Sequence, residues 1–278
     1  QTILDLSAEA MEAKPDIVIW PEAALPRLLQ YHEDTYKAVT GFARSHRVWM
    51  MVGAEDATPG EGPDGANNPN YFNSAFLVSP QGRLEMESKY DKRHLVIFGE
   101  YVPLARWLPF LRMFSPVGAG FTPGAGPVWM APAAPFDVRA APLICFEDCL
   151  PWMAREHVDA DTDFLLNLTN DGWFGASSQQ WQHAANSAFR AVENGVPMVR
   201  CANNGLSCWA DEFGVLHDIE FDNGQSVYAS GYKLIELEFW RPRVARVQTF
   251  YNRHGDWFGW SCAFLSVALL ARSLRGRP

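Results

Sequence analysis

Three short apolar segments of this chain each lead to a chemically reactive side chain, and this repeated arrangement limits the fold more than any other feature. Residues 17–20 lead to Glu22, residues 141–144 lead directly to Cys145, and a third extended stretch precedes Lys92. Short apolar runs of this kind are typical of strands that are buried on both faces. The sequence therefore predicts covered sheets with a carboxylate, a thiol and an amine at strand ends.

Predicted helices alternate with the predicted strands along most of the chain. The predicted helices cover residues 2–13, 26–45, 150–157 and 178–194. The predicted strands cover residues 17–20, 48–53, 128–130, 136–139, 142–145, 163–168, 197–201, 207–210 and 234–239. Two further strands, at residues 72–78 and 84–90, flank a Ser-Pro-Gln-Gly turn and predict a β-hairpin. Alternation that is interrupted by hairpins favours an α/β fold with mixed sheets over a plain doubly wound sheet.

The charge balance and the cysteine spacing exclude two classes of function. The 23 basic and 32 acidic side chains leave a net charge of −9. A nucleic-acid-binding protein needs a basic surface, so we expect no nucleic-acid partner. The five cysteines lack the common zinc spacings, and we expect neither a metal nor another cofactor. An odd number of cysteines leaves at least one thiol outside any intramolecular pair. A disulfide between Cys201 and Cys208 is one of the alternatives that the sequence allows.

The C-terminal segment has the composition of a membrane-spanning helix. Residues 257–274 carry Arg272 as their one charged side chain, and as a helix they would extend roughly 27 Å, close to the hydrocarbon thickness of a bilayer. Aromatic residues lie at the start, and Arg272, Arg275 and Arg277 lie at the end. We therefore expect a transmembrane helix at residues 255–274, after a catalytic domain at residues 1–250 on the non-cytoplasmic side. A buried core helix is the alternative.

The three reactive side chains suit acyl transfer through a cysteine. A free thiol is only slightly ionised at neutral pH, so it needs a base or a cationic neighbour. Glu22 would lie behind a buried strand, in surroundings of low dielectric that make a carboxylate a better base. Lys92 would favour the thiolate and, with the backbone N–H of Phe146, would stabilise a tetrahedral oxyanion.

Each of these side chains also has an ordinary structural interpretation. Cysteine is often simply buried, a glutamate after a proline often begins a helix, and most lysines are solvated. The combination of Glu22, Lys92 and Cys145 at three strand ends favours a catalytic triad. Cys149 is the rival nucleophile, but it lies inside the segment after the strand and not at its end.

Longer motifs around these residues resemble the nitrilase, or carbon–nitrogen hydrolase, superfamily. They are Trp20-Pro21-Glu22, the block from Tyr90 to Pro103 that contains Lys92, and Leu143-Ile144-Cys145-Phe146-Glu147. The middle block is similar to the apolipoprotein N-acyltransferase family, as are Asn170-Asp171-Gly172-Trp173-Phe174-Gly175, Gln182-His183, and Arg200 with Asn203-Asn204-Gly205. The likeness covers about residues 15–240.

This resemblance implies an α-β-β-α sandwich that moves a fatty acyl chain from a phospholipid to the N-terminal amine of a diacylglyceryl-cysteine apolipoprotein, through a cysteine thioester. It implies a monomer of the bacterial inner membrane with a periplasmic catalytic domain. It also implies supporting roles at the oxyanion or substrate for Glu100, Phe146, Glu147 and Trp173. Phe146 stands where this family usually has tyrosine, and we expect the first strand of the sandwich to be missing.

Two other functions stay open. A soluble amidase or nitrilase could hydrolyse a small C–N substrate with the same three residues, and a catalytically inactive domain of this fold could bind lipid or act as a scaffold. The C-terminal segment and the apolar residues 103–121 argue against the amidase, because such a loop could shield a thioester from water. The complete Glu22, Lys92 and Cys145 set argues against the inactive domain.

Overall fold

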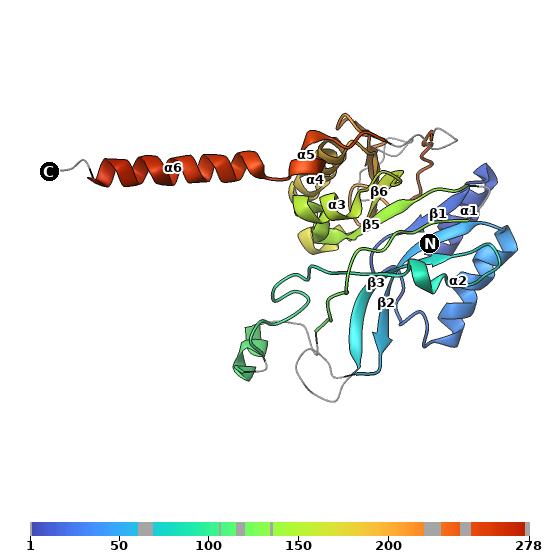
Figure 1. Cartoon of the computed structure of the whole chain (residues 1–278). Helices are drawn as coiled ribbons and strands as arrows, with labels where there is room; N and C mark the ends of the chain where they lie inside the picture. Colours follow the sequence, from blue (N-terminus) through green and yellow to red (C-terminus); the bar gives the residue numbers. More distant parts are fainter. Residues whose placement is uncertain are drawn as a thin grey trace.

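The computed structural model describes residues 2–60, 69–105, 107–114, 120–133, 136–219, 229–239 and 246–275. These residues form two central sheets with helices on both outer faces (Figure 1). The helices are α1 (Ile3–Ala10), α2 (Glu33–His46), α3 (Pro151–His157), α4 (Gln179–Asn194), α5 (Phe250–His254) and α6 (Trp257–Arg275). The strands are β1 (Ile17–Trp20), β2 (Trp49–Thr58), β3 (Asn70–Val78), β4 (Tyr90–Asp91), β5 (Ala140–Ile144), β6 (Phe164–Asn170), β7 (Met198–Asn203), β8 (Cys208–Ala210) and β9 (Leu216–His217). Short 3-10 turns are η1 (Met11–Ala13), η2 (Met86–Ser88), η3 (Pro109–Phe114), η4 (Cys145–Cys149) and η5 (Asp171–Phe174).

Both sheets are mixed, as the sequence predicts. The first has the order β1-β2-β3-β4, with β1 parallel to β2 and the remaining pairs antiparallel. The second has the order β5-β6-β7-β8-β9, in which β5, β6 and β7 are parallel and the last two strands are antiparallel. The strands before Glu22 and Lys92 are the two edges of the first sheet, whereas the strand before Cys145 belongs to the second, so packing of the two sheets must bring the three residues together.

Alternating residues of the strands fill three layers of apolar core. In β2, Met51 faces the core between the sheets, whereas Met50 faces α2. The third layer lies between the second sheet and the helices α3 and α4, where Leu143 and Leu165 pack against Met153. Both faces of the first sheet are covered, and for this reason the first residues of β2, Trp49 to Val52, form a continuous apolar run in the sequence. The result is the predicted α-β-β-α sandwich.

Five predicted elements differ from the structure. The short strands predicted at residues 128–130 and 136–139 are absent from the described residues, where Met130 makes only an isolated bridge to Ala140. The helix predicted for residues 26–45 begins only at Glu33, because Leu29 is buried in a turn and its N–H donates to the carbonyl of Glu55. The second hairpin strand is interrupted by η2 and keeps only β4 and a bridge at Leu84. Among the described residues, 234–239 form no strand, although Phe239 packs against the core between the sheets.

Helix α6 extends away from the sandwich as a straight arm (Figure 1). It has 19 residues and a mean hydropathy of 1.3, and none of its side chains is buried. By length and composition it can cross a membrane. Within the described residues α6 packs against no core, which favours the membrane-spanning interpretation over the buried core helix.

A second apolar segment projects from the sandwich at residues 103–114. It carries η3, which is the isolated short green helix of Figure 1. Trp107 is 78% exposed and Met113 is 86% exposed, and neither has a core to pack into. Residue 106 and residues 115–119 of the predicted apolar loop lie outside the described residues.

Candidate active site

Cys145 leaves the second sheet at a sharp turn between β5 and η4. Its backbone φ is 53°, in the left-handed region that residues other than glycine rarely adopt. Asn167 stabilises this turn, because its side-chain N–H donates to the Cys145 carbonyl at 3.0 Å. The residue as a whole is partly exposed. A strained, accessible cysteine at a strand end is suited to act as a nucleophile.

Lys92 follows β4, and its ammonium lies between two carboxylates. The Nζ atom is 3.2 Å from Glu22 Oε1 and 2.7 Å from Glu100 Oε1. Lys92 is only 1% exposed and Glu22 only 5%. Buried charges are stable when they are paired, so the two carboxylates explain how a lysine can be held without water. Glu100 therefore positions the lysine.

Two contacts of this cluster were not predicted from the sequence. Asn73 in β3 donates from Nδ2 to Glu22 Oε1 at 2.7 Å and to Glu100 Oε1 at 3.1 Å. The backbone N–H of Asn170, at the end of β6, donates to Glu22 Oε2 at 2.8 Å. These donors fix both carboxylates and connect Glu22 to the second sheet. A polar residue in the buried strand β3 was the one available signal for Asn73.

Electrostatic interactions couple the three predicted catalytic residues. Burial by itself lowers the pKa of Lys92, but Glu22, Cys145 and Glu100 outweigh that effect and raise the pKa above its ordinary value. Burial and, to a smaller extent, the charge of Glu22 raise the pKa of Cys145, Lys92 opposes them, and the net pKa is about 11. Lys92 is thus cationic, and Cys145 is a thiol at rest. A base must remove its proton before it can attack.

Glu147 forms the connection between the two halves of the site. Its carboxylate is fully buried and accepts four hydrogen bonds at 2.7 to 2.9 Å, from the backbone N–H groups of Arg93, His94 and Ile144 and from the hydroxyl of Tyr90. These donors belong to the segment around Lys92 and to the strand that ends at the nucleophile. Glu147 therefore holds the segment around Lys92 at a fixed distance from the end of β5. Because its oxygens already accept four hydrogen bonds, it has little capacity left to bind a substrate.

The other predicted residues lie at the surface of the site. Phe146 is 40% exposed and Trp173, in η5, is 75% exposed. The backbone N–H of Phe146 lies in the first turn of η4, where such groups lack an intrahelical acceptor. Trp173 does not pack into a corner, which leaves it available to a substrate or a membrane. The rival nucleophile, Cys149, lies at the far end of η4 beside Asp148 and Asn186.

A second buried charge cluster lies next to Cys145. His183 has Nδ1 at 2.8 Å from Asp171 Oδ1 and Nε2 at 2.9 Å from Asp148 Oδ1. Arg200 bridges the same carboxylates at 2.9 Å and 2.8 Å. Burial lowers the pKa of His183, but the charges of Asp148 and Asp171 and the hydrogen bonds to them outweigh burial and raise it to about 12. The cluster thus pairs two cations with two anions. Sequence analysis marked these motifs but assigned them no role.

Asp148, Cys149 and His183 have side-chain donor atoms within 4.8 Å of one another, as a metal site requires. Both nitrogens of His183 already contact carboxylates, however, and its raised pKa keeps both protonated. An imidazolium has no lone pair for a metal. The chemistry of this donor set therefore favours ion pairs over a metal ion.

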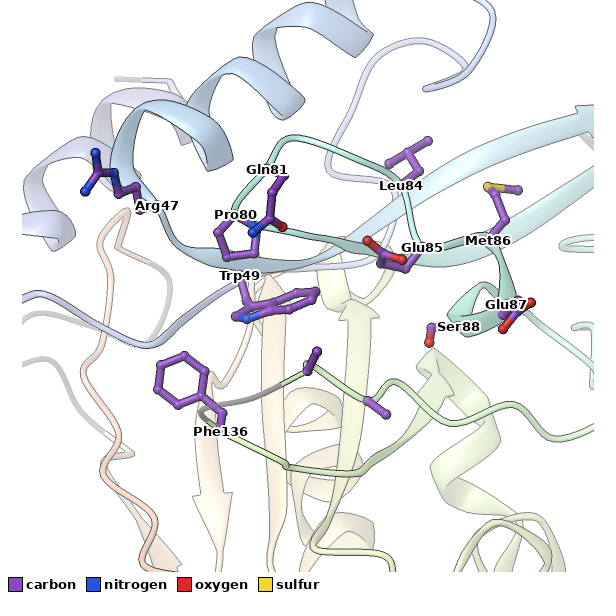
Figure 2. Close-up of a pocket in the computed structure, with 12 residues that line it drawn as sticks. Arg47, Trp49, Pro80, Gln81, Leu84, Glu85, Met86, Glu87, Ser88 and Phe136 are labelled. Atoms are coloured by element: carbon purple, nitrogen blue, oxygen red, sulfur yellow. The ribbon is translucent and has the colours of Figure 1, made fainter.

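The described grooves do not coincide with this cluster of side chains. A groove of about 970 Å³ is lined by Trp49, Leu84, Met86 and Phe136 among others (Figure 2). Trp49 begins β2 and lies beside Ile17, the first residue of β1, whereas Glu22 follows the end of β1. The groove therefore lies at the opposite end of the strands. The two cysteines that could have formed a bridge, Cys201 and Cys208, are both free thiols.

Comparison with known proteins gives matches to a family and to several curated relatives. The model of the carbon–nitrogen hydrolase family matches residues 1–230. The chain is 37% identical to the apolipoprotein N-acyltransferase of Geobacter metallireducens, over 97% of this chain and 48% of the relative. It is 36% identical to that of Brucella melitensis biotype 1, over 72% of this chain and 36% of the relative. The chain thus spans about half, or less, of the length of these curated relatives.

Solved structures with a similar fold include a mutant of the amidase from Nesterenkonia sp. AN1 that shows Michael addition of acrylamide at its active-site cysteine. That structure matches with a TM-score of 0.53 and 18% identity, over 77% of this chain and 79% of the amidase. Another mutant of the same nitrilase-superfamily amidase matches with the same score, over 77% of each chain. At this identity the match shows the fold alone.

Proposed function

Because this chain belongs to the carbon–nitrogen hydrolase family, we propose that it is the catalytic part of an apolipoprotein N-acyltransferase. The observation that carries the proposal is the exposed apolar helix α6 on the same chain as the Glu22, Lys92 and Cys145 cluster. A soluble amidase has no use for such a helix. The curated relatives of that name, one of which matches 97% of the chain, support the same choice.

The proposed first half-reaction loads an acyl chain onto Cys145. Glu22 removes the thiol proton, and the sulfur attacks the ester carbonyl carbon of a phospholipid. Lys92 and the backbone N–H of Phe146 stabilise the oxyanion that forms. The C–O bond then breaks, Glu22 returns the proton to the leaving oxygen, and lysophospholipid departs. A thioester remains on the enzyme.

The second half-reaction transfers the chain to an apolipoprotein. Glu22 takes a proton from the N-terminal amine of the diacylglyceryl-cysteine, and the amine nitrogen attacks the thioester carbonyl. The C–S bond breaks and Cys145 regains its proton. Water must be kept from the thioester between the two steps, and the apolar segment at residues 103–114 is suited to that shielding.

The proposed membrane orientation follows from the charges at the C-terminal end of α6. Arg272 and Arg275 lie in its last turn, and arginines flank membrane spans predominantly on the cytoplasmic side. The catalytic sandwich would then lie on the opposite, periplasmic side of a bacterial inner membrane. We propose phospholipid and diacylglyceryl apolipoprotein as the substrates of a monomer.

Intact-mass analysis after incubation with phospholipid vesicles tests this function. We expect a mass increase of one fatty acyl group that hydroxylamine removes, that a diacylglyceryl-cysteine peptide discharges, and that Cys145→Ser lacks. Cys149→Ser is the matched control and should still be acylated. Release of ammonia from small amides, without any acyl adduct from phospholipid, would instead identify an amidase. A folded protein that does neither would contradict both activities.

A further inference from the structure

The two oxygens of the Glu22 carboxylate have different partners, and these partners belong to different sheets. Oε1 accepts hydrogen bonds from Asn73 in β3 and from Lys92 directly after β4, both on the first sheet. Oε2 accepts from the backbone N–H of Asn170 at 2.8 Å, and Asn170 is the last residue of β6. Oε2 is therefore the oxygen that contacts the second sheet, which also carries Cys145.

The register of β5 and β6 places Asn170 at the same end of the sheet as the nucleophile. Ile144 pairs with Leu168 in parallel register, so Cys145 and Asn170 both lie just beyond this pair. A carboxylate can accept about two hydrogen bonds at each oxygen. Among the contacts of the described residues, Glu22 Oε1 accepts two and Oε2 accepts one. Oε2 therefore has an open position for a proton.

The residue after Asn170 holds this N–H in place. The Asp171 carboxylate is completely buried and lies 2.8 Å from His183 Nδ1 and 2.8 Å from a terminal nitrogen of Arg200. Buried charges are stable only while they are paired, so the Asp171 side chain cannot move away from the two cations. The neighbouring Asn170 peptide shares this restraint.

The same two cations also hold the turn that begins at Cys145. His183 Nε2 lies 2.9 Å from Asp148 Oδ1, and the other terminal nitrogen of Arg200 lies 2.9 Å from Asp148 Oδ2. Asp148 belongs to η4, whose first residue is Cys145. The buried cluster therefore connects the turn of the nucleophile to the N–H that holds the base.

Close packing around Gly205 offers a way to displace Asp171 without a change in charge. Gly205 is buried, and a Cβ atom on it would lie 2.4 Å from Asp171 Oδ2 and 2.6 Å from Asp171 Cβ. The carboxylate would have to move to make room. Gly205→Ala therefore shifts Asp171 but removes no charged or hydrogen-bonding group.

We propose that Asp171, His183 and Arg200 are positioning residues for the general base. They act through the backbone N–H of Asn170, which directs Oε2 of Glu22 toward the thiol. The thiol proton moves from Sγ to Oε2, the electron pair of the S–H bond stays on sulfur, and no other bond changes. This inference rests on the proposed function only in taking Glu22 as the base for the nucleophilic cysteine.

The test measures how fast iodoacetamide alkylates Cys145 in the full chain in detergent, resolved by peptide mass, between about pH 7 and pH 10. The charges of Glu22, Lys92 and His183 act on this thiol, whose pKa is about 11. Thiolate formed by loss of the proton to water falls about tenfold for each pH unit below that value. Thiolate formed by transfer to Glu22 does not change with pH, because the proton stays within the protein. We therefore expect the wild-type rate to level off toward pH 7, whereas Glu22→Gln should keep falling.

Gly205→Ala should lose this level region and react about tenfold more slowly than wild type near pH 7, as expected for a weakened hydrogen bond to a charged group. Its rate should approach the wild-type rate near pH 10, whereas a general loss of structure would change the rate at every pH. Asp171→Asn replaces it if the alanine variant fails to fold. Gly126→Ala is the matched control, because a Cβ atom there meets nothing within 4 Å.

The outcomes separate this inference from the proposed function. A wild-type profile in Gly205→Ala and Asp171→Asn, with the level region lost in Glu22→Gln, would overturn the inference and keep Glu22 as the base. Profiles of equal slope in wild type and Glu22→Gln would overturn both. Alkylation needs no phospholipid, so a Gly205 effect in a protein that forms no acyl adduct would retain the inference and reject the acyltransferase.

Discussion

Tyr90 and Glu147 connect the two sheets of the sandwich through one hydrogen bond. The Tyr90 hydroxyl, from β4, donates to Glu147 Oε2 at 2.8 Å, and both side chains are fully buried. The same oxygen accepts the backbone N–H of Ile144 at the end of β5. The strand before Lys92 and the strand before Cys145 are thus held by one carboxylate.

Removal of this hydroxyl should destabilise the protein and slow acylation. Tyr90→Phe leaves the fully buried Glu147 with one donor fewer, at a cost of about 1–3 kcal/mol in the free energy of unfolding. Urea unfolding measures the cost, and intact mass measures acylation. Tyr36→Phe is the control, because Tyr36 lies at the surface of α2 and its replacement should change stability by less than about 0.5 kcal/mol. Equal effects of the two changes would contradict the proposed connection.

Lys92→Met should have a larger effect on both stability and activity. It leaves Glu22 and Glu100 buried without their cation, which costs about 3–5 kcal/mol. Loss of an oxyanion donor also lowers the acylation rate by about 10²-fold or more. Lys37→Met is the control, because Lys37 pairs with Glu33 at the exposed surface, where such pairs contribute at most about 1 kcal/mol. A Lys92 variant of wild-type stability would show that the charges are not coupled.

The sequence could predict the three principal side chains because each follows a strand end. Glu22, Lys92 and Cys145 are marked by short-range patterns, and packing of two covered sheets brings them together. Asn73 could not be predicted in this way. It lies 51 residues from Glu22 along the chain, and nothing around it in the sequence indicates that contact.

The elements that sequence analysis placed wrongly were determined by tertiary contacts. Residues 26–32 follow a helical pattern, but the buried Leu29 binds the backbone of β2 and the helix begins later. Residues 235, 237 and 239 alternate as in a strand and do pack on the core between the sheets. Among the described residues no strand pairs with them. Alternation of apolar residues in the sequence does not show whether a partner strand is present.

Gly53→Ala should displace Glu22. A Cβ atom on Gly53 would lie 2.2 Å from the Pro21 carbonyl oxygen and 2.7 Å from Glu22 Cα, so the backbone that carries the base must move. We expect lower stability and an acylation rate reduced by about 10²-fold, as a displacement of about 1 Å can cause. Gly41→Ala in α2 meets nothing within 4 Å and should raise stability by about 0.5–1 kcal/mol. Wild-type activity in the Gly53 variant would contradict this geometry.

Removal of α6 should change solubility more than folding. Its side chains are exposed and contribute nothing to the described core. A chain that ends after Gly255 should therefore keep the alkylation rate of Cys145 but remain monodisperse in size-exclusion chromatography without detergent. Replacing Phe264 and Leu265, both exposed, with serine in the full chain is a milder control in the same direction. Detergent dependence that persists after truncation would place the lipid contact elsewhere.

The buried cluster around His183 should make stability depend on pH in a defined direction. Asp148 and Asp171 raise the pKa of His183 to about 12 despite burial, whereas the ordinary value is 6.5. The folded chain therefore holds a proton that the unfolded chain releases above pH 6.5. The stabilisation is complete below that pH and is lost as the pH rises toward the folded value, by about 1.4 kcal/mol per unit. The loss of unfolding free energy that His183→Gln causes should therefore become smaller by about 1.4 kcal/mol per pH unit between about pH 7 and pH 9.

Urea unfolding of wild type and variant at several pH values measures this difference. His46→Gln is the control, because His46 is exposed and lies outside this cluster. Wild-type and His183→Gln curves that stay parallel from about pH 7 to pH 9 would mean that His183 is neutral in the folded protein.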